Sequence, residues 1–528
     1  MNEERWPAAA LAAAGLLFVL LATANSAGYR YGVSDQSFHV PAAIRVVDPA
    51  TFPRDAAMIE TQARLMLMDD AAGALVRATG LSLEAVFFGG YLLTAALLWA
   101  GILLIGRYHL RSALATVLFG AVVTLRHRIP RTSANSIEPY FYPRSLAFAL
   151  GVIAVAMVLR RKYGPALLLV AASVLVHVTT GAWFVVLIGV AGVRMSGVLR
   201  HAFFRGPRPL ILVAIAAMIA AVGGLAMSAR LQPLITPIDA AWLEVIATKD
   251  SLFPNEWPAW AWLANGGLPV VLLGIHHWRG RLGTRTAEDD GLVTGALALT
   301  CIFVVSVPFV ALHWTFPTQL QISRVFWLIE FVTLLYGVAL VTDLSRRHGA
   351  LTLRVATAVV LAVSVARGAY VMLVEHPERR IFEVSLPASD WTAAMQWLAT
   401  QPVDVNVLAD PGHALLYGSS VRVAAQRDVV LEDAKDTAVA LYSRDVAVRV
   451  GERRLNLANF AQLSSERAAA LSRRYEVDYL VTAGAPLSFP VAYTNATFRI
   501  YDMRGARGET GPSPPGAGAE RATIVTNP

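Results

Sequence analysis

Three charged side chains stand close to the ends of long apolar segments, where a lipid phosphate would meet the protein. Asp35 follows the first apolar segment, which ends near Ala24. Its carboxylate can accept a proton from a hydroxyl or bind a divalent cation. Arg144 and Arg324 each open a later apolar segment. A guanidinium can hold a phosphate through two parallel hydrogen bonds. These residue types therefore suit chemistry on a phosphate-linked substrate at a membrane surface.

Each of these residues also has a simpler explanation. Asp35 can form a turn or cap a helix. An arginine at the end of a span commonly extends to the lipid headgroups. The stretch 126–144 favours phosphate binding, because it carries four arginines although we expect it to lie outside the cytoplasm, where basic residues are scarce. Those arginines are Arg126, Arg128, Arg131 and Arg144. We expect Arg128 and Arg131 to join Arg144 and Arg324 as phosphate ligands.

Three further residues are candidates for binding a substrate. His39 lies in the same loop as Asp35, and Glu138 precedes Arg144 in the run 138–144. His177 interrupts an apolar stretch, and an ionisable residue within the membrane is a functional candidate. A histidine that caps a turn explains His177 equally well. The spacing of the histidines matches no metal site, and with Cys301 as the one cysteine the chain has no cysteine cluster.

The composition requires a membrane protein. Of the 528 residues, 56% are hydrophobic and 16% are charged, and the mean hydropathy is +0.52; soluble domains are about 25% charged. The net charge of +8 comes from basic residues that cluster at the ends of apolar segments, as in cytoplasmic loops of membrane proteins. We find no nucleic-acid-binding signature.

The apolar segments predict eleven spans, with the N-terminus cytoplasmic and the C-terminus outside. The stretch 165–193 would be about 43 Å long as one helix, and it is basic at both ends. We therefore divide it into two short helices that turn near His177. The spans are expected at about 7–24, 85–105, 112–125, 145–159, two within 165–193, 210–228, 260–276, 292–312, 325–342 and 353–374.

The long first loop, 25–84, contains one amphipathic pattern. Residues from Met58 to Thr79 repeat at steps of three and four, which predicts one helix. A helix in the membrane interface and a packed surface helix fit this pattern equally well.

The C-terminal part has a different composition. Within 375–504, short strands are expected at 405–409, 429–432, 479–482 and 498–502, with helices at 389–400 and 464–475. This alternation predicts a small α/β domain. The Gly- and Pro-rich tail, 505–528, is expected to be disordered. The domains are thus 1–374, 375–504 and the tail.

These features together resemble the GT-C superfamily of membrane glycosyltransferases. The resemblance rests on the long first external loop with an early aspartate, the short paired helices, and an α/β domain on the outer side. The segments Glu138–Arg144, His177–Thr180 and Gln321–Arg324 look like those of uncharacterised bacterial members. Asp35 is followed by Gln36 and Ser37, so the paired-acid Asp-x-Asp metal motif is missing, and a metal-independent enzyme without cofactors is expected.

The resemblance implies a donor and a location. The donor would be a polyprenyl-phosphate-linked sugar that enters from the outer leaflet of a bacterial plasma membrane, and the acceptor an unidentified glycan or protein. Asp35 would be catalytic, and the arginines would hold the phosphate. Two alternatives remain: a non-catalytic scaffold or assembly protein of the same fold, and a transporter or flippase. The absence of an internal repeat argues against the transporter.

Overall fold

The computed structural model describes residues 8–196 and 236–507 of the chain. The span expected at 210–228 and nearly all of the expected tail 505–528 lie outside these residues.

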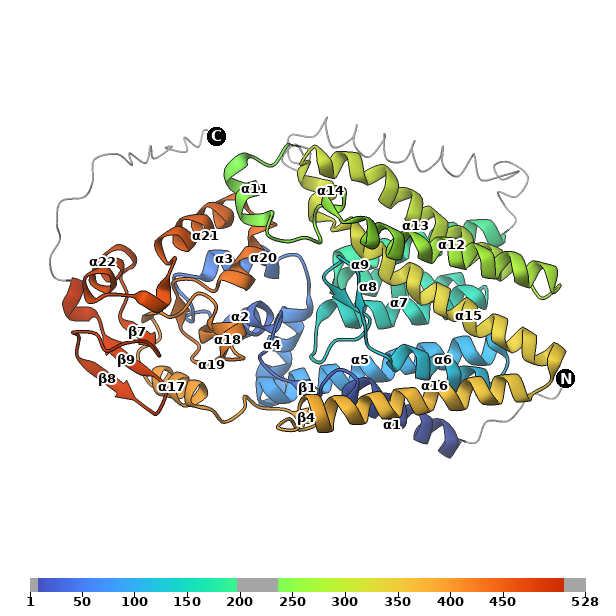
Figure 1. Ribbon diagram of the computed structural model, residues 1–528, viewed down its shortest axis with the longest axis horizontal. Coiled ribbons are helices and arrows are strands. Elements are labelled where there is room, and N and C mark those ends of the chain that lie inside the picture. Colours follow the sequence, from blue (N-terminus) through green and yellow to red (C-terminus); the bar gives the residue numbers. More distant parts are fainter. Residues whose placement is uncertain (1–7, 197–235, 508–528) are drawn as a thin grey trace.

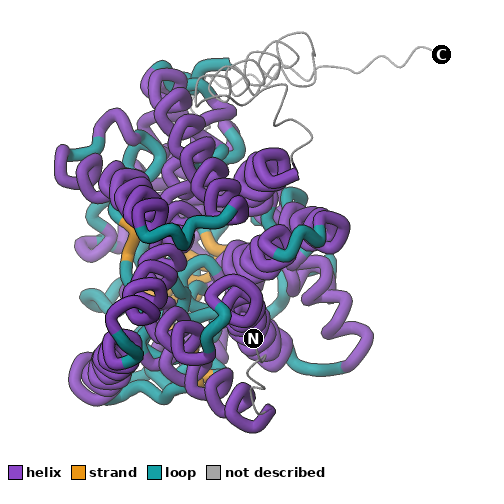
Figure 2. Tube along the Cα trace, turned by 90° about the vertical axis from the view of Figure 1, so that its right-hand side faces the viewer, coloured by secondary structure: helices purple, strands orange, loops and turns teal. Residues whose placement is uncertain are grey.

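Ten apolar helices of the described residues form a bundle, seen from the side in Figure 1 and end-on in Figure 2. With their adjoining turns, six are long and apolar enough to cross a membrane, and four are shorter. The multi-span helical fold is therefore as predicted. The ten helices are α1 (Ala8–Ala24), α5 (Leu83–Ile105), α6 (Ala113–Thr124), α7 (Pro143–Leu159), α8 (Tyr163–Val176), α9 (Val178–Ser196), α12 (Ala259–Arg281), α13 (Ala287–Ala311), α15 (Val325–His348) and α16 (Leu351–Tyr370).

Capping residues set where the long helices begin. The Ser82 hydroxyl accepts a hydrogen bond from the backbone N–H of Ala85 at the start of α5. Thr286 and Asp289 form a reciprocal capping box at the start of α13. The 23 residues of α5 extend about 35 Å, enough to cross a hydrocarbon core of about 30 Å.

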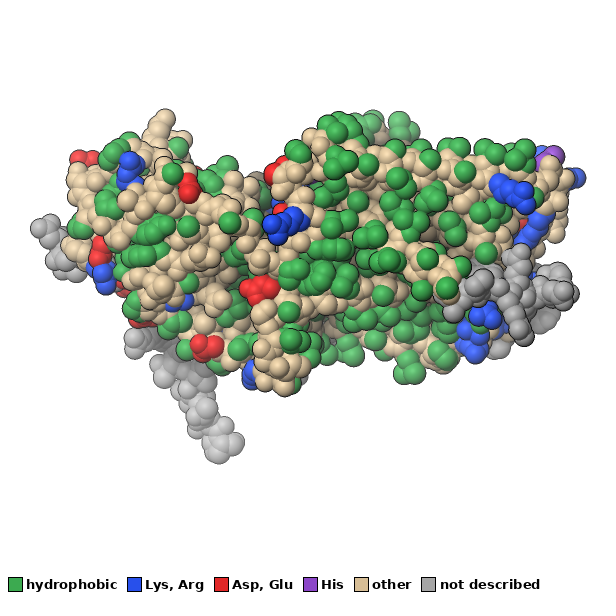
Figure 3. Space-filling view, turned by 90° about the horizontal axis from the view of Figure 1, so that it is seen from below, with side chains coloured by type: hydrophobic (Ala, Val, Ile, Leu, Met, Phe, Trp, Pro, Cys, Tyr) green, Lys and Arg blue, Asp and Glu red, His purple; other side chains and the backbone are tan. Residues whose placement is uncertain are grey.

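The outer surface of the bundle is apolar. Leu168 and Leu263 are each 75% exposed, and Leu373 is 73% exposed. Figure 3 shows hydrophobic side chains spread over the bundle and Lys and Arg side chains toward its two ends. An extended apolar surface of this kind is stable in lipid and costly in water.

Helices α8 and α9 form the antiparallel pair that the sequence predicts. The chain breaks at His177, whose backbone is extended. Gly192 in α9 lies opposite Tyr163 at the start of α8, and Gly181 lies against Val174 near its end. The His177 ring caps α9, because its Nδ1 accepts a hydrogen bond from the backbone N–H of Thr180.

The first loop contains three helices, α2 (Gln36–Val47), α3 (Ala56–Ala63) and α4 (Met68–Thr79). The prediction of one helix from Met58 to Thr79 was wrong. The chain turns between α3 and α4, and the backbone N–H of Leu67 donates to the carbonyl of Leu175 near the end of α8. This bond satisfies one of the carbonyls that a helix end leaves unpaired, and it ties the loop to the α8–α9 turn.

The C-terminal domain is built on a five-stranded sheet of order β6-β5-β7-β9-β8. The strands β6 and β7 pair parallel to β5, whereas β9 pairs antiparallel to β7 and β8. The strands are β5 (Asn406–Leu408), β6 (Asp428–Val429), β7 (Tyr479–Thr482), β8 (Val491–Thr494) and β9 (Arg499–Asp502); the main helices are α17 (Asp390–Ala399), α20 (Asp433–Ala440), α21 (Arg444–Asn456) and α22 (Ser465–Tyr475). Three of the four predicted strands and both predicted helices are present; the strand predicted at 429–432 overlaps β6 at Val429 alone, and β8, α20 and α21 were not predicted.

The α/β domain lies at the end of the bundle opposite to the start of α1, with α2, α3 and α4 between them (Figure 1). A parallel bridge joins β1 (Tyr29–Arg30), just after α1, to β4 (Phe382–Glu383), which follows α16. The first and last helices of the bundle are therefore connected where the domain begins.

A buried network of charges fixes the domain to the first loop. The Arg422 guanidinium, in the short helix α19 (Val421–Ala424), donates to Asp55 of the loop at 2.8 Å and to both oxygens of Asp436 at 2.6 and 3.0 Å. The Asp428 carboxylate accepts hydrogen bonds from the backbone N–H groups of Arg54 and Asp55. Burial would raise the pKa of Asp55, but Arg422 and Arg449 beside it hold that pKa below its ordinary value.

Replacing Arg422 should destabilise the protein strongly. Arg422→Ala leaves the Asp55 and Asp436 carboxylates buried without this cation, a loss of about 3–5 kcal/mol. The measurement is the thermal unfolding of the detergent-purified protein. The matched control is Arg474→Ala, which breaks an exposed pair with Glu452 worth about 0–1 kcal/mol. Equal melting temperatures for the two variants would contradict the interpretation that this network fixes the α/β domain to the first loop.

Candidate functional site

A cavity of about 1150 Å³ lies where the bundle, the first loop and the α/β domain meet. Its wall is formed by the start of α2, the stretch 126–144, the α8–α9 turn, the segment before α15, and α20. The volume is sufficient for a lipid headgroup together with a sugar.

The charged side chains of this cavity are mostly basic. A low-dielectric cavity with such an excess of cations attracts an anion. The basic residues in the wall are Arg64, Arg126, Arg128, Arg144, Lys249, Arg324, Lys435 and Arg444, and the acidic residues are Asp35 and Glu138.

The structure brings most of the candidate residues together. Asp35, Arg144 and Arg324, which lie far apart in the sequence, all line the cavity. The cavity wall also includes Arg128, Glu138 and His177. The site thus draws on at least four separate segments of the chain.

Two candidate residues lie elsewhere. His39 is buried behind the cavity wall, where its Nδ1 lies 3.0 Å from Asp69 of α4; it joins α2 to α4. The Arg131 guanidinium is 2.7 Å from the Asp250 carboxylate and lies over the Trp260 ring. His39 and Arg131 are therefore not among the residues that line the cavity, and each has a carboxylate partner outside it.

Arg144 is held rigidly at the start of α7. Pro143 opens the helix, and the Arg144 side chain is only 2% exposed. Its Nη2 donates to Glu138 at 3.2 Å, and its guanidinium lies over the rings of Tyr142 and Trp327. A side chain buried in this way is not extending to the lipid headgroups. Its buried Nε has no hydrogen-bond partner among the described residues.

Arg324 is the less committed of the two arginines. It ends a short 3-10 turn (Ile322–Arg324) that leads into α15. The turn starts at Gln321, whose backbone is left-handed and whose side-chain amide donates to the Tyr442 hydroxyl at 2.8 Å. In the described part of the chain the buried Nε of Arg324 has no partner. Arg324 as a whole is half-buried, but a buried donor atom without a partner is costly.

Asp35 differs from the free carboxylate that the sequence suggests. It precedes α2, and its Oδ1 accepts a hydrogen bond from Lys435 Nζ of α20 at 2.7 Å. Burial would raise the pKa of Asp35, but Lys435, and then Arg144, hold that pKa well below its ordinary value. Asp35 is thus ionised but weakly basic while Lys435 stays in place.

Glu138 is the second carboxyl group of the cavity. It accepts hydrogen bonds from Asn135 of β3 (Ala134–Asn135) and from Arg144. Burial raises the pKa of Glu138, although Arg144 opposes this effect. Its contacts make it the group that orients Arg144.

Sequence reasoning missed the contribution of the α/β domain. Lys435 and Tyr442 reach the cavity from that domain, and Lys249 reaches it from the loop after α11 (Ala240–Ile246). One feature of the sequence could have drawn attention to Lys249 and Lys435. The chain has three lysines among its 45 basic residues, Lys162, Lys249 and Lys435, and two of them line this cavity.

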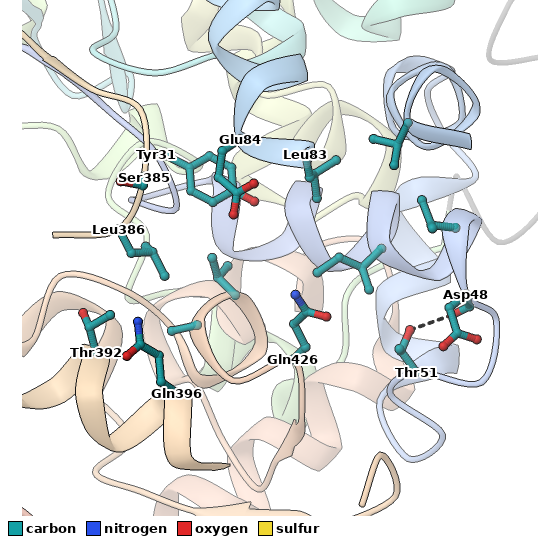
Figure 4. Close-up of a pocket in the computed structure, with 15 residues that line it drawn as sticks. Tyr31, Asp48, Thr51, Leu83, Glu84, Ser385, Leu386, Thr392, Gln396 and Gln426 are labelled. Carbon is teal, nitrogen blue, oxygen red and sulfur yellow. Dashed lines mark hydrogen bonds between the residues drawn. The ribbon is translucent and has the colours of Figure 1, made fainter. Parts of the chain in front are cut away.

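A second, smaller cavity of about 550 Å³ lies at the other end of α2 (Figure 4). Figure 4 shows Glu84 beside Tyr31 on one side and Gln396 and Gln426 on the other. Among the described residues its lining includes carboxylates and amides but no Lys or Arg. Such a wall does not attract a phosphate, so the larger cavity is the candidate site for an anion.

Comparisons with known proteins identify no family for the chain. No family model matches it, and no curated protein matches it. Among solved structures, the apo form of the oligosaccharyltransferase from Archaeoglobus fulgidus is similar with a TM-score of 0.47 and 12% identity, over 91% of this chain and 70% of that chain. A likeness at this level assigns no role to any residue, so the argument for function rests on the cavity.

Proposed function

We propose that the protein is a membrane glycosyltransferase of the GT-C type, which moves a sugar from a polyprenyl-phosphate donor to an acceptor. The observation that carries this proposal is the juxtaposition of Arg144 and Arg324, both with unused donors, with the Asp35 carboxylate in one cavity. The cavity lies where the apolar bundle ends and the polar domain begins. A lipid-linked substrate places its phosphate at that level.

The reaction follows from the charges in the cavity. The acceptor hydroxyl oxygen bonds to the anomeric carbon of the sugar, and the bond from that carbon to the phosphate oxygen breaks. The electron pair leaves with the phosphate, while positive charge develops on the sugar. Arg144 and Arg324 stabilise the growing negative charge on the phosphate. Asp35 takes the proton of the acceptor hydroxyl.

The same proposal assigns a location. The α/β domain and the cavity would lie outside a bacterial plasma membrane, where a polyprenyl-phosphate sugar is available without transport of a nucleotide. Placement of the cavity at the end of the bundle favours transfer over transport, because transporter sites lie near the middle of the membrane. A non-catalytic scaffold remains the alternative that the experiments below distinguish.

Asp35→Asn should abolish sugar transfer. The change removes the proton acceptor, and general-base catalysis contributes a factor of about 10²–10⁴. The measurement is mass spectrometry of the cell-envelope glycans from cells in which the variant replaces the wild-type protein. Asp70→Asn, which changes an exposed aspartate of α4, is the matched control and should leave the glycans unchanged. Normal glycans in both strains would remove Asp35 from the mechanism.

Arg324→Ala and Arg144→Ala should each weaken binding of a fluorescent short-chain polyprenyl phosphate to the purified protein. Each change removes charge-assisted hydrogen bonds worth about 1.5–3 kcal/mol, or about tenfold or more in affinity. Arg144→Lys checks for misfolding at Arg144, because it preserves the charge beside Glu138. Arg161→Ala, which breaks an exposed pair with Glu288, is the control. If affinity is unchanged in both cavity variants, the scaffold becomes the better proposal.

A further inference from the structure

One contact in the cavity conflicts with the proposed role of Asp35. Lys435 Nζ lies 2.7 Å from Asp35 Oδ1 and 3.3 Å from the Ser34 hydroxyl. A carboxylate that is paired with an ammonium ion is a poor proton acceptor, because protonation would sacrifice the ion pair. The resting protein is therefore not ready to activate an acceptor hydroxyl.

The ion pair between Asp35 and Lys435 depends on how the α/β domain sits against the first loop. Asp35 lies at the start of α2 in the first loop, and Lys435 lies in α20 of the α/β domain, 400 positions away in the sequence. The two side chains are 24% and 12% exposed, and both line the cavity. The ion pair is thus part of the cavity wall and within reach of a bound ligand.

Among the cations of this wall, Lys435 is the one best suited to change partners. Arg144 is fixed by Glu138 and by the two aromatic rings beneath it. Lys249 donates to the backbone carbonyl of Ala434, next to Lys435. Lysine is a point charge on a flexible four-carbon chain, and the sole anion that Lys435 contacts is Asp35 within the described residues.

A phosphate in the cavity would compete with Asp35 for this ammonium ion. Arg144 and Arg324 line the same cavity, and their guanidinium groups would place the phosphate. The Tyr442 hydroxyl accepts a hydrogen bond from the Gln321 side chain at 2.8 Å, which connects the α/β domain to the turn that carries Arg324. The phosphate of a lipid-linked sugar is esterified on both sides, so it carries one negative charge and two free oxygens, as a carboxylate does, and can replace Asp35 as the partner of Lys435.

We propose that Lys435 exchanges Asp35 for the phosphate of the lipid-linked donor when the donor binds, so that Asp35 becomes a proton acceptor only in the loaded cavity. This inference rests on the proposed function and deepens it. The α/β domain then serves as the sensor of the donor. An acceptor hydroxyl is not activated in an empty site, because Asp35 remains paired with Lys435 until the donor arrives.

A double-mutant cycle on binding tests this exchange without any transfer assay. The probe is the same fluorescent short-chain polyprenyl phosphate, and the proteins are wild type, Asp35→Asn, Lys435→Met and the double variant. Lys435→Met should weaken binding about tenfold, through loss of a charge-assisted contact. Asp35→Asn should strengthen binding about tenfold, because it releases Lys435 and also removes the repulsion between carboxylate and phosphate.

The decisive quantity is the effect of Asp35→Asn in the two backgrounds. Without Lys435, the repulsion alone remains, so Asp35→Asn should strengthen binding by less than about threefold. If Asp35→Asn changes the binding affinity equally with and without Lys435, the proposed exchange is overturned. Lys435 would then interact with Asp35 and with the phosphate independently. Lys162→Met, at an exposed lysine that does not line the cavity, is the control and should combine additively with Asp35→Asn. Non-additivity there would also overturn the proposal, because the coupling would then not require Lys435.

Two further measurements separate the ways in which the idea can fail. If Lys435→Met lowers the melting temperature, Lys435→Gln replaces it in the cycle, because glutamine retains a hydrogen-bond donor for Asp35 without the charge. Arg144→Ala and Arg324→Ala are measured in parallel. If both leave binding unchanged, the proposed function fails; if they weaken binding while the cycle is additive, only the exchange of Lys435 fails.

Discussion

The buried contact between Arg422 and Asp55 determines where the α/β domain sits, and the candidate site depends on that position. Arg422 holds the loop carboxylate and Asp436 at the same time. Asp436 belongs to α20, the helix that also carries Lys435. The contact that fixes the domain to the first loop therefore also sets the distance between Lys435 and Asp35. Charged groups suit this task better than apolar ones, because a buried guanidinium with three carboxylates nearby tolerates few alternative arrangements.

The bundle makes the complementary contribution, which is a rigid backbone at the cavity wall. Arg144 begins α7 and Arg324 leads into α15, so the backbone that carries each guanidinium belongs to a helix that is largely buried in the bundle. The Phe148 and Trp327 rings, one from each helix, stack with their centres 3.9 Å apart. This packing keeps the two helix starts together. A site that must stabilise charge as it develops benefits from donors that are positioned before the reaction begins.

The sequence predicts the helices and turns whose formation depends on residues close together in the chain. Apolar segments, basic loop ends and the break at His177 correspond to helices, because hydrophobicity and capping act over a few residues. Asp35, Arg144 and Arg324 could be selected because each stands at the end of a span, and the structure places all three at one cavity. The single helix from Met58 to Thr79 was wrong because a hydrogen bond from Leu67 to a distant carbonyl outweighs the local periodicity.

What the sequence did not show is the pairing of residues across the domain boundary. His39 and Arg131 match the site in type, but their partners, Asp69 and Asp250, come from elements whose position depends on the whole fold. Lys435 was missed for the same reason, since nothing near it in the sequence indicates Asp35. Because Lys435 lies beside it, Asp35 is an ion-paired carboxylate and not the free base that the sequence suggests. In the proposed exchange, Asp35 and the donor phosphate compete for the Lys435 ammonium ion. In the proposed exchange, the α/β domain supplies this cation, so the chemistry of the cavity depends on a ligand that the bundle and the α/β domain contact together.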